Sequence, residues 1–283
     1  MRFSKNLQSV ARHFFYGNVW IAMMSVAAMW QASMLLKLSV SPDLYLLMFF
    51  ATLSHYNIDR LLEHKHYSNS IQVRHKWLSD RKTLLLFFSL LPGLFAALLL
   101  IRLPIACILW VGVLVFFAMM YSLPITWKGL KLSFRQWGIS KPLLIGLVWS
   151  GMSAGLLLVY HQQSMLPHLS YLLGYWFFIS ALCLPFDWRD RVQDHAAEIN
   201  TLALRLQPKR LLILQALLLG FSGLLIQYWF PKPLWSLWFV FLGTLLISHQ
   251  AMYRDGEYWY LFGIDGLIGL LAFVSYLELQ TLN

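Results

Sequence analysis

Long runs of apolar residues, separated by shorter polar segments, make up most of this chain. The runs are roughly 17–22 residues long, which in a helix rising 1.5 Å per residue crosses about 30 Å of hydrocarbon. The pattern predicts nine membrane-spanning helices, at residues 17–37, 42–62, 83–101, 104–122, 139–160, 169–186, 211–229, 234–252 and 259–278. No polar linker long enough to separate two domains interrupts them. Residues 1–283 are therefore expected to form one all-α transmembrane domain, a polytopic helical bundle.

The residues before the first span, 1–16, place apolar and basic side chains on separate faces. Phe3, Leu7, Val10 and Phe14 share one face of a helix, which is typical of a short helix lying in the membrane interface. A secretory signal is the alternative. It is disfavoured because the apolar run that follows is long and no small-residue cleavage site comes after it.

Composition supports a membrane protein, because only 12% of the residues are charged and soluble domains have about 25%. The net charge of +10 reflects topology: 19 of the 22 Lys and Arg residues lie in the N-terminal segment or in alternate links, the others being Lys37, Arg102 and Lys232. Basic loops face the cytoplasm. We therefore expect a multi-pass protein of a bacterial cytoplasmic membrane, with its N-terminus inside, its C-terminus outside and no nucleic-acid partner. Cys107 and Cys183 lie in apolar runs and imply no disulfide framework.

The sixth span ends in the stretch DWRDRVQDHAAEINTLALRL, which begins at Asp187. Asp187, Asp190 and Asp194 fall within about 60° of one another around a helix. Three like charges on one stripe repel each other, and a divalent cation would relieve this. Mg²⁺ is typically held by one or two carboxylates together with substrate phosphates, so the spacing indicates a Mg²⁺–diphosphate site. A solvated loop with ordinary charges is the alternative.

A second acidic stripe ends the second span, at the same predicted membrane face. Asp59 and Glu63 are four residues apart, and His55 lies one turn earlier on the same stripe. Two such stripes at one face are less easily explained as solvated helix ends. A diphosphate also needs cationic or hydrogen-bonding partners, and the same face offers Arg74, Tyr121, Lys128, Lys131 and Arg205. Anchoring to anionic lipid, or for the tyrosine an interfacial position, is the alternative reading of each.

These motifs resemble the UbiA superfamily of intramembrane prenyltransferases. The second aspartate-rich motif of that family, D-x-x-D-x-x-x-D followed by T-L-A, matches Asp187 to Asp194 and the residues 201–203, and YSLPITWK at 121–128 resembles its Y-S-x-P…K stretch. The nine-span layout is similar as well. The first motif departs, because His55 and Tyr56 stand where the family pattern has Asn and Asp.

The resemblance implies Mg²⁺-dependent transfer of a prenyl group from a prenyl diphosphate to an acceptor that the sequence does not identify. It implies Mg²⁺ held between the two acidic motifs, the lipid tail in a bilayer-facing groove, and an allylic cation as the reacting species. Asp59, Asp187 and Asp190 are the expected catalytic residues. The expected metal ligands are Asp59, Glu63, Asp187, Asp190 and Asp194, and the expected diphosphate-binding residues are Arg74, Tyr121, Lys128, Lys131 and Arg205.

Two other classes of protein fit parts of the pattern. A transporter would usually show internal repeats and broken helices near mid-membrane. No clear repeat is visible in the sequence, but Asp265 lies within the last span. A catalytically inert member that binds a lipid or isoprenoid is the other alternative, given the altered first motif. Membrane lipids are expected partners, and no protein partner is inferred. Mg²⁺-dependent release of diphosphate would separate an enzyme from both alternatives.

Overall fold

The computed structural model describes residues 5–64, 77, 80–122, 126–127, 130–131, 140–196, 199–230, 232–254 and 256–282. These residues are almost entirely helical. The elements are α1 (Lys5–Tyr16), α2 (Val19–Leu36), α3 (Pro42–His64), α5 (Lys82–Leu100), α6 (Ile105–Ser122), β1 (Thr126–Trp127), β2 (Leu130–Lys131), α7 (Ser140–Ser150), η2 (Gly151–Gly155), α8 (Leu156–Tyr160), η3 (Leu166–His168), α9 (Leu169–Ala196), α10 (Leu202–Arg205), α11 (Pro208–Trp229), α12 (Trp235–Tyr253), η4 (Trp259–Ile264) and α13 (Asp265–Leu282).

The nine predicted spans all fall on helical segments of the described chain. Seven of these segments are long and apolar enough to cross a membrane, and α6 is a shorter apolar helix. α3 carries several polar residues at its C-terminal end. The chain is thus an all-α integral membrane protein. Among the described residues, the strands form one antiparallel pair of two residues each, with Thr126 opposite Lys131.

The helix that contains the sixth predicted span, 169–186, continues beyond the span. α9 runs through the acidic stripe to Ala196, in agreement with the helical stripe predicted for Asp187, Asp190 and Asp194. The polar side chains beyond the apolar run find partners there, since Asp187 lies beside Lys141 and Asp190 beside Arg189. The whole stripe therefore lies on one rigid helix.

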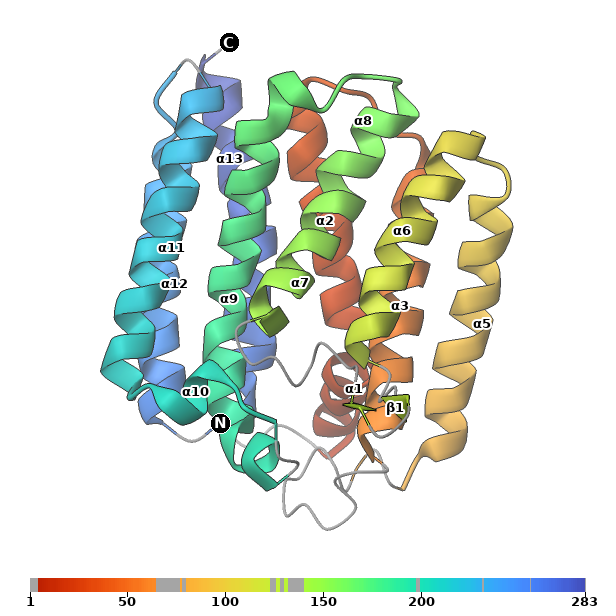
Figure 1. The fold of residues 1–283 in the computed structure, drawn as a ribbon, viewed down its shortest axis with the longest axis vertical. Helices are drawn as coiled ribbons and strands as arrows, with labels where there is room; N and C mark the ends of the chain where they lie inside the picture. Colours follow the sequence, from red (N-terminus) through yellow and green to blue (C-terminus); the bar gives the residue numbers. More distant parts are fainter. Residues whose placement is uncertain are drawn as a thin grey trace.

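The helices stand side by side in one bundle (Figure 1). α5 forms one edge and α11 with α12 forms the other, while α9 packs between α7 and α11. α1, α10 and the short strands gather at the lower end, and the links from α5 to α6 and from α8 to α9 lie at the upper end. α1, α10 and the acidic C-terminal ends of α3 and α9 therefore share one end of the bundle.

Small residues allow the helices that build this end to approach closely, as is common in membrane proteins. A Cβ added at Gly146 of α7 would lie 2.6 Å from the Trp176 carbonyl oxygen of α9. The Trp176 indole N–H also donates to the Leu143 carbonyl of α7, at 2.6 Å. These contacts fix the height of α7 against α9.

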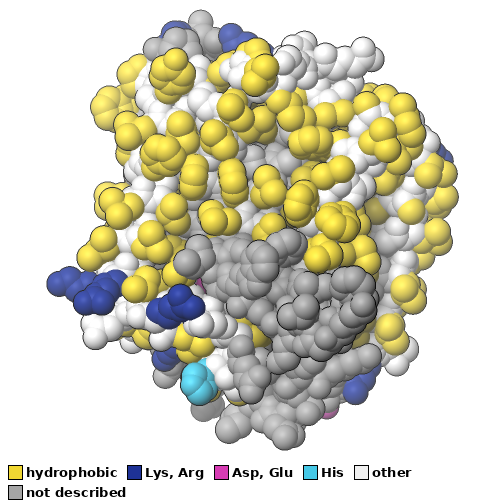
Figure 2. Space-filling view, in the orientation of Figure 1, with side chains coloured by type: hydrophobic (Ala, Val, Ile, Leu, Met, Phe, Trp, Pro, Cys, Tyr) yellow, Lys and Arg dark blue, Asp and Glu magenta, His cyan; other side chains and the backbone are white. Residues whose placement is uncertain are grey.

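The outer surface of the bundle is apolar. Figure 2 shows hydrophobic side chains over the middle of one face, with Lys and Arg toward its ends. Exposed leucines and phenylalanines on α5 include Phe87 and Leu90, and α11 adds Leu217 and Leu224. In water such a surface would be costly, whereas lipid tails solvate it. The helix that was predicted to lie in the interface is present as α1, and its position in a membrane stays a prediction.

Candidate functional site

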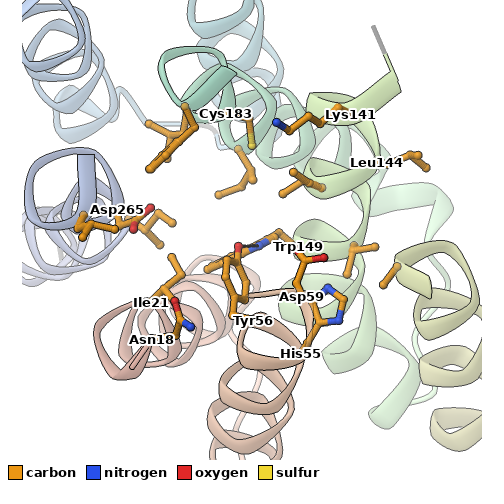
Figure 3. A pocket seen from close by; sticks show the side chains of 18 of the residues that line it. Asn18, Ile21, His55, Tyr56, Asp59, Lys141, Leu144, Trp149, Cys183 and Asp265 are labelled. Atoms are coloured by element: carbon orange, nitrogen blue, oxygen red, sulfur yellow. Dashed lines mark hydrogen bonds between the residues drawn. The ribbon is translucent and has the colours of Figure 1, made fainter. Parts of the chain in front are cut away.

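A cavity of about 160 Å³ lies among α2, α3, α7, α9 and α13, toward the end of the bundle that carries the acidic stripes. Its charged lining is unusual for a membrane interior, since ionisable groups there are expensive and mark functional sites by default. The charged residues that line it, within the described chain, are Asp59, Arg60, Lys141, Asp187, Arg189, Asp190 and Asp265. Figure 3 shows Asp59, Lys141 and Asp265 reaching toward the cavity from three different helices.

The acidic stripe of α9, formed by Asp187, Asp190 and Asp194, holds a buried ionic cluster. The ammonium of Lys141, at the start of α7, lies 2.8 Å from Asp187 Oδ1 and 3.7 Å from Asp194 Oδ2. Both carboxylates are essentially fully buried. Charges so removed from water persist only when they are paired. Lys141 therefore holds the two ends of the stripe together.

Asp190, between them, is paired differently. The Arg189 guanidinium donates two hydrogen bonds to its carboxylate, from Nε at 2.7 Å and from an Nη at 2.9 Å. The same guanidinium lies 5.0 Å from the ring centre of Phe186 and 5.3 Å from that of Tyr260. This bidentate geometry, with aromatic rings beside it, orients both groups at the cavity wall.

The α3 side contributes Asp59, as the sequence predicted. Its Oδ1 atom is buried and accepts no hydrogen bond from any described residue. A buried carboxylate oxygen without a donor is costly, and a bound cation would satisfy it. One turn earlier, the Tyr56 hydroxyl accepts a hydrogen bond from the Trp149 indole at 3.3 Å (Figure 3). Asn57 points elsewhere, tying α3 to Asn18 beneath α2 with a bond of 3.0 Å.

Asp265 enters the cavity from the last span, opposite the α7 side (Figure 3). It is the first residue of α13 and directly follows η4, a six-residue π-helical segment. Such segments are wide turns within a helix and occur often at functional sites. The sequence left Asp265 without a firm role, and the structure places it in the same cavity as the two acidic stripes.

The remaining wall is mostly apolar and mixes aliphatic side chains with aromatic rings. Rings come from α1, α2, α3, α6, α7 and α9, and these lining residues are Phe15, Trp20, Tyr56, Phe117, Trp149 and Phe186. Aromatic faces attract cations, and an apolar wall keeps water from the interior. The cavity is thus charged toward its acidic helix ends and mostly apolar, with several aromatic rings, around the rest of its wall.

The structure brings together three of the predicted site residues, Asp59, Asp187 and Asp190, as lining of one cavity. Asp194 lies just beyond them and joins the cluster through Lys141. Arg205 is not brought there: it lies on α10, is exposed, and donates to the Asn200 side chain at 2.9 Å. It borders a separate hollow with Trp188 and Arg191.

The other predicted residues cannot be placed at the level of side chains. Arg74 and Lys128 lie outside the described residues. Glu63 is in the last turn of α3, Tyr121 is near the end of α6 and Lys131 is in β2, but their side chains are outside the description. Their roles stay predictions.

Three cavity residues were missed in the sequence. Lys141, at the inner end of a span, looked like an ordinary membrane anchor, and Arg189 is two residues along from Asp187 and so off the acidic stripe. Arg60 directly follows Asp59 and also lines the cavity. The available signal was the burial cost of a charged residue inside a predicted span, which already demands a partner.

Comparison with solved structures identifies the architecture. The structure of a UbiA homolog from Archaeoglobus fulgidus, described as bound to GPP and Mg²⁺, matches with a TM-score of 0.64 over 93% of this chain and 98% of its own, at 11% sequence identity. No protein-family model matches the chain, and no curated protein sequence matches it either. The protein is therefore a polytopic membrane protein with a UbiA-like fold.

A Mg²⁺ ion partly fits the residues of this cavity. The unsatisfied Asp59 oxygen is the kind of ligand that Mg²⁺ prefers. The α9 stripe is less ready to bind a metal ion, because its carboxylates already lie beside Lys141 and Arg189. Within the described part of the chain, no three His, Cys, Asp or Glu residues converge as a metal site. A metal here would therefore depend on oxygen atoms from a substrate as well.

Proposed function

We propose that this protein transfers a prenyl group from a prenyl diphosphate to an acceptor within the membrane, with Mg²⁺ as its cofactor. The observation that carries the proposal is the meeting of Asp59 from α3 with Asp187 and Asp190 from α9 at one aromatic-lined cavity. The fold supports it, since the solved UbiA homolog that shares this fold is described as bound to GPP and Mg²⁺.

Residues in the charged part of the cavity would bind the diphosphate and Mg²⁺, and residues in the apolar part would bind the prenyl chain. Arg60, Lys141 and Arg189 offer positive charge to the diphosphate. Asp59 and Asp190 are the residues proposed to hold Mg²⁺, which when bound would stabilise negative charge on the leaving diphosphate. The prenyl chain would lie along the aromatic and aliphatic wall and exclude water from the reacting carbon.

The proposed reaction breaks the bond between prenyl C1 and the diphosphate oxygen, and the electron pair leaves with the diphosphate. An acceptor atom then bonds to C1 and loses a proton. The allylic carbon carries positive charge between these events, and the rings of Trp149 and Tyr56 line the same cavity. Aromatic faces stabilise such a charge by up to about 2 kcal/mol when desolvated. The apolar wall keeps water from capturing it.

The proposal also includes the orientation of the protein in the membrane. The 19-to-3 distribution of basic residues supports a cytoplasmic location for the end that holds α1, α10 and the acidic stripes. A prenyl diphosphate is polar at one end and apolar at the other. It would then enter from the cytoplasmic leaflet with its diphosphate toward that end.

A turnover assay on purified protein tests the proposal. Geranyl, farnesyl and geranylgeranyl diphosphates are supplied with a panel of aromatic and glycerol phosphate acceptors, and released diphosphate and prenylated product are both measured. Release should require Mg²⁺ and cease with a chelator. Asp190→Asn should lower the rate by about 100-fold, equivalent to about 2.7 kcal/mol of transition-state stabilisation. The replacement keeps the side chain's size and a hydrogen-bond acceptor for Arg189.

The matched control is Asp80→Asn, at an exposed position before α5, which should keep the wild-type rate. Prenyl diphosphate binding without release under every acceptor condition would favour an inert isoprenoid-binding protein. Neither binding nor release would leave the transporter-like alternative.

A further inference from the structure

The ammonium of Lys141, which lies beside Asp187 and Asp194, is a positive charge at an unfavourable position. Lys141 is the second residue of α7, and the N-terminus of a helix is an unfavourable place for a cation because of the helix dipole. Its side chain is only 10% exposed, so the ammonium has also lost most of its water. Two separate costs are accepted to put a positive charge at this position, and the two carboxylates beside it offset them.

The geometry resembles that of a bridging cation. Asp187 and Asp194 are two helical turns apart on α9, and the one ammonium lies within 4 Å of an oxygen of each. Mg²⁺ bound by the same oxygens would sit about 2.0–2.1 Å from them. A metal and the ammonium cannot both occupy the space between these two carboxylates.

We propose that the Lys141 ammonium is a resident cation of this site, which takes the place of a divalent ion between Asp187 and Asp194. While Lys141 is present, no divalent ion bridges these two carboxylates, and metal binding is confined to the Asp59 and Asp190 side of the cavity. The inference rests on the proposed function in taking Mg²⁺ as the metal that the cavity binds. It assigns Lys141 as the cation that pairs with both ends of the α9 stripe, Asp187 and Asp194.

Metal binding to the substrate-free protein tests this directly. Lys141→Met removes the ammonium and keeps most of the side-chain length, so the two buried carboxylates lose its positive charge. Its affinity for Mn²⁺, followed by electron paramagnetic resonance of the free ion, should rise about tenfold or more above that of the wild type. The double variant Lys141→Met with Asp187→Asn loses one charge of each sign and should return to the wild-type affinity. Lys209→Met removes an exposed lysine at the start of α11 and should change nothing.

Lys141→Gln serves as a second variant in case Lys141→Met does not fold, because glutamine keeps hydrogen-bond donors for the carboxylates. It too should gain Mn²⁺ affinity. If the folded Lys141 variant binds Mn²⁺ no more tightly than the wild type, the inference is wrong. The assay contains no prenyl diphosphate, so this outcome is distinct from an absence of turnover, which would count against the proposed function alone.

Discussion

At the scale of single residues, the site depends on pairs that lie on different helices. Lys141 of α7 pairs with Asp187 and Asp194 of α9, whereas Asp59 of α3 faces the cavity with an unsatisfied oxygen. The carboxylates therefore differ in readiness although they are alike in sequence. Those on α9 each lie beside a lysine or arginine cation, and at Asp59 a bound metal ion would supply the missing partner of Oδ1.

Asp59→Asn should weaken Mg²⁺-dependent binding of a prenyl diphosphate by about tenfold or more, because a neutral amide is a poorer Mg²⁺ ligand than a carboxylate. The temperature of thermal unfolding should not fall, because the change also removes a charge from the membrane interior. Affinity would be measured by calorimetry with and without Mg²⁺. Asp43→Asn is the matched control, since Asp43 begins the same helix at its opposite end. Equal Mg²⁺ dependence in both variants would reduce Asp59 to a helix-end charge.

At the scale of elements, the position of α7 against α9 determines whether Lys141 reaches its carboxylates. Gly146, five residues after Lys141, is the point where α7 comes close to α9. A Cβ at Gly146 would meet the Ser180 hydroxyl and the Trp176 carbonyl. A membrane interior supplies little hydrophobic force between helices. Close backbone approach and hydrogen bonds such as that of Trp176 must set the register.

Gly146→Ala should therefore destabilise the protein, by about 1–3 kcal/mol as expected for overpacking. Gly112→Ala on α6 is the control, because a Cβ there meets nothing within 4 Å. That change should be neutral or slightly stabilising, since alanine favours a helix by up to about 1 kcal/mol over glycine. Thermal unfolding in one detergent compares the two. Equal unfolding temperatures would contradict the view that α7 and α9 are held in close backbone contact.

At the scale of the whole molecule, the bundle has two unlike ends. One carries α1, α10 and the cavity's acidic stripes, and the other carries the links between α5 and α6 and between α8 and α9 (Figure 1). The exposed apolar side chains between these ends are suited to lipid (Figure 2). The distribution of basic residues predicts that the end with α1 and α10 faces the cytoplasm.

Cysteine labelling tests the orientation in a chain whose Cys107 and Cys183 are replaced by serine. A cysteine at Ser164, exposed in the link between α8 and α9, should react with an impermeant thiol reagent in intact cells. A cysteine at Gln207, exposed before α11, should react only after the membrane is opened. Both changes are at exposed positions, so neither should affect folding. The opposite labelling pattern would invert the topology and with it the side from which substrate enters.

The sequence by itself determined the helical architecture and the two acidic stripes. Each depends on periodicity along one segment: an apolar run long enough to span lipid must be a helix there, because no other open structure satisfies its backbone. The helical period of 100° per residue placed Asp187, Asp190 and Asp194 on one face. The similarity to the UbiA architecture followed from these local patterns, and the fold comparison confirmed it.

Only the tertiary structure decided which charges meet. Lys141 and Arg205 look alike in sequence, as basic residues near inner helix ends, yet one is buried between two aspartates and the other is exposed beside Asn200. Helix periodicity fixes the direction of a side chain relative to its own axis. The rotation and height of each helix against its neighbours depend on contacts such as that of Gly146 with α9. Such contacts join residues far apart in the chain, and no local pattern specifies them.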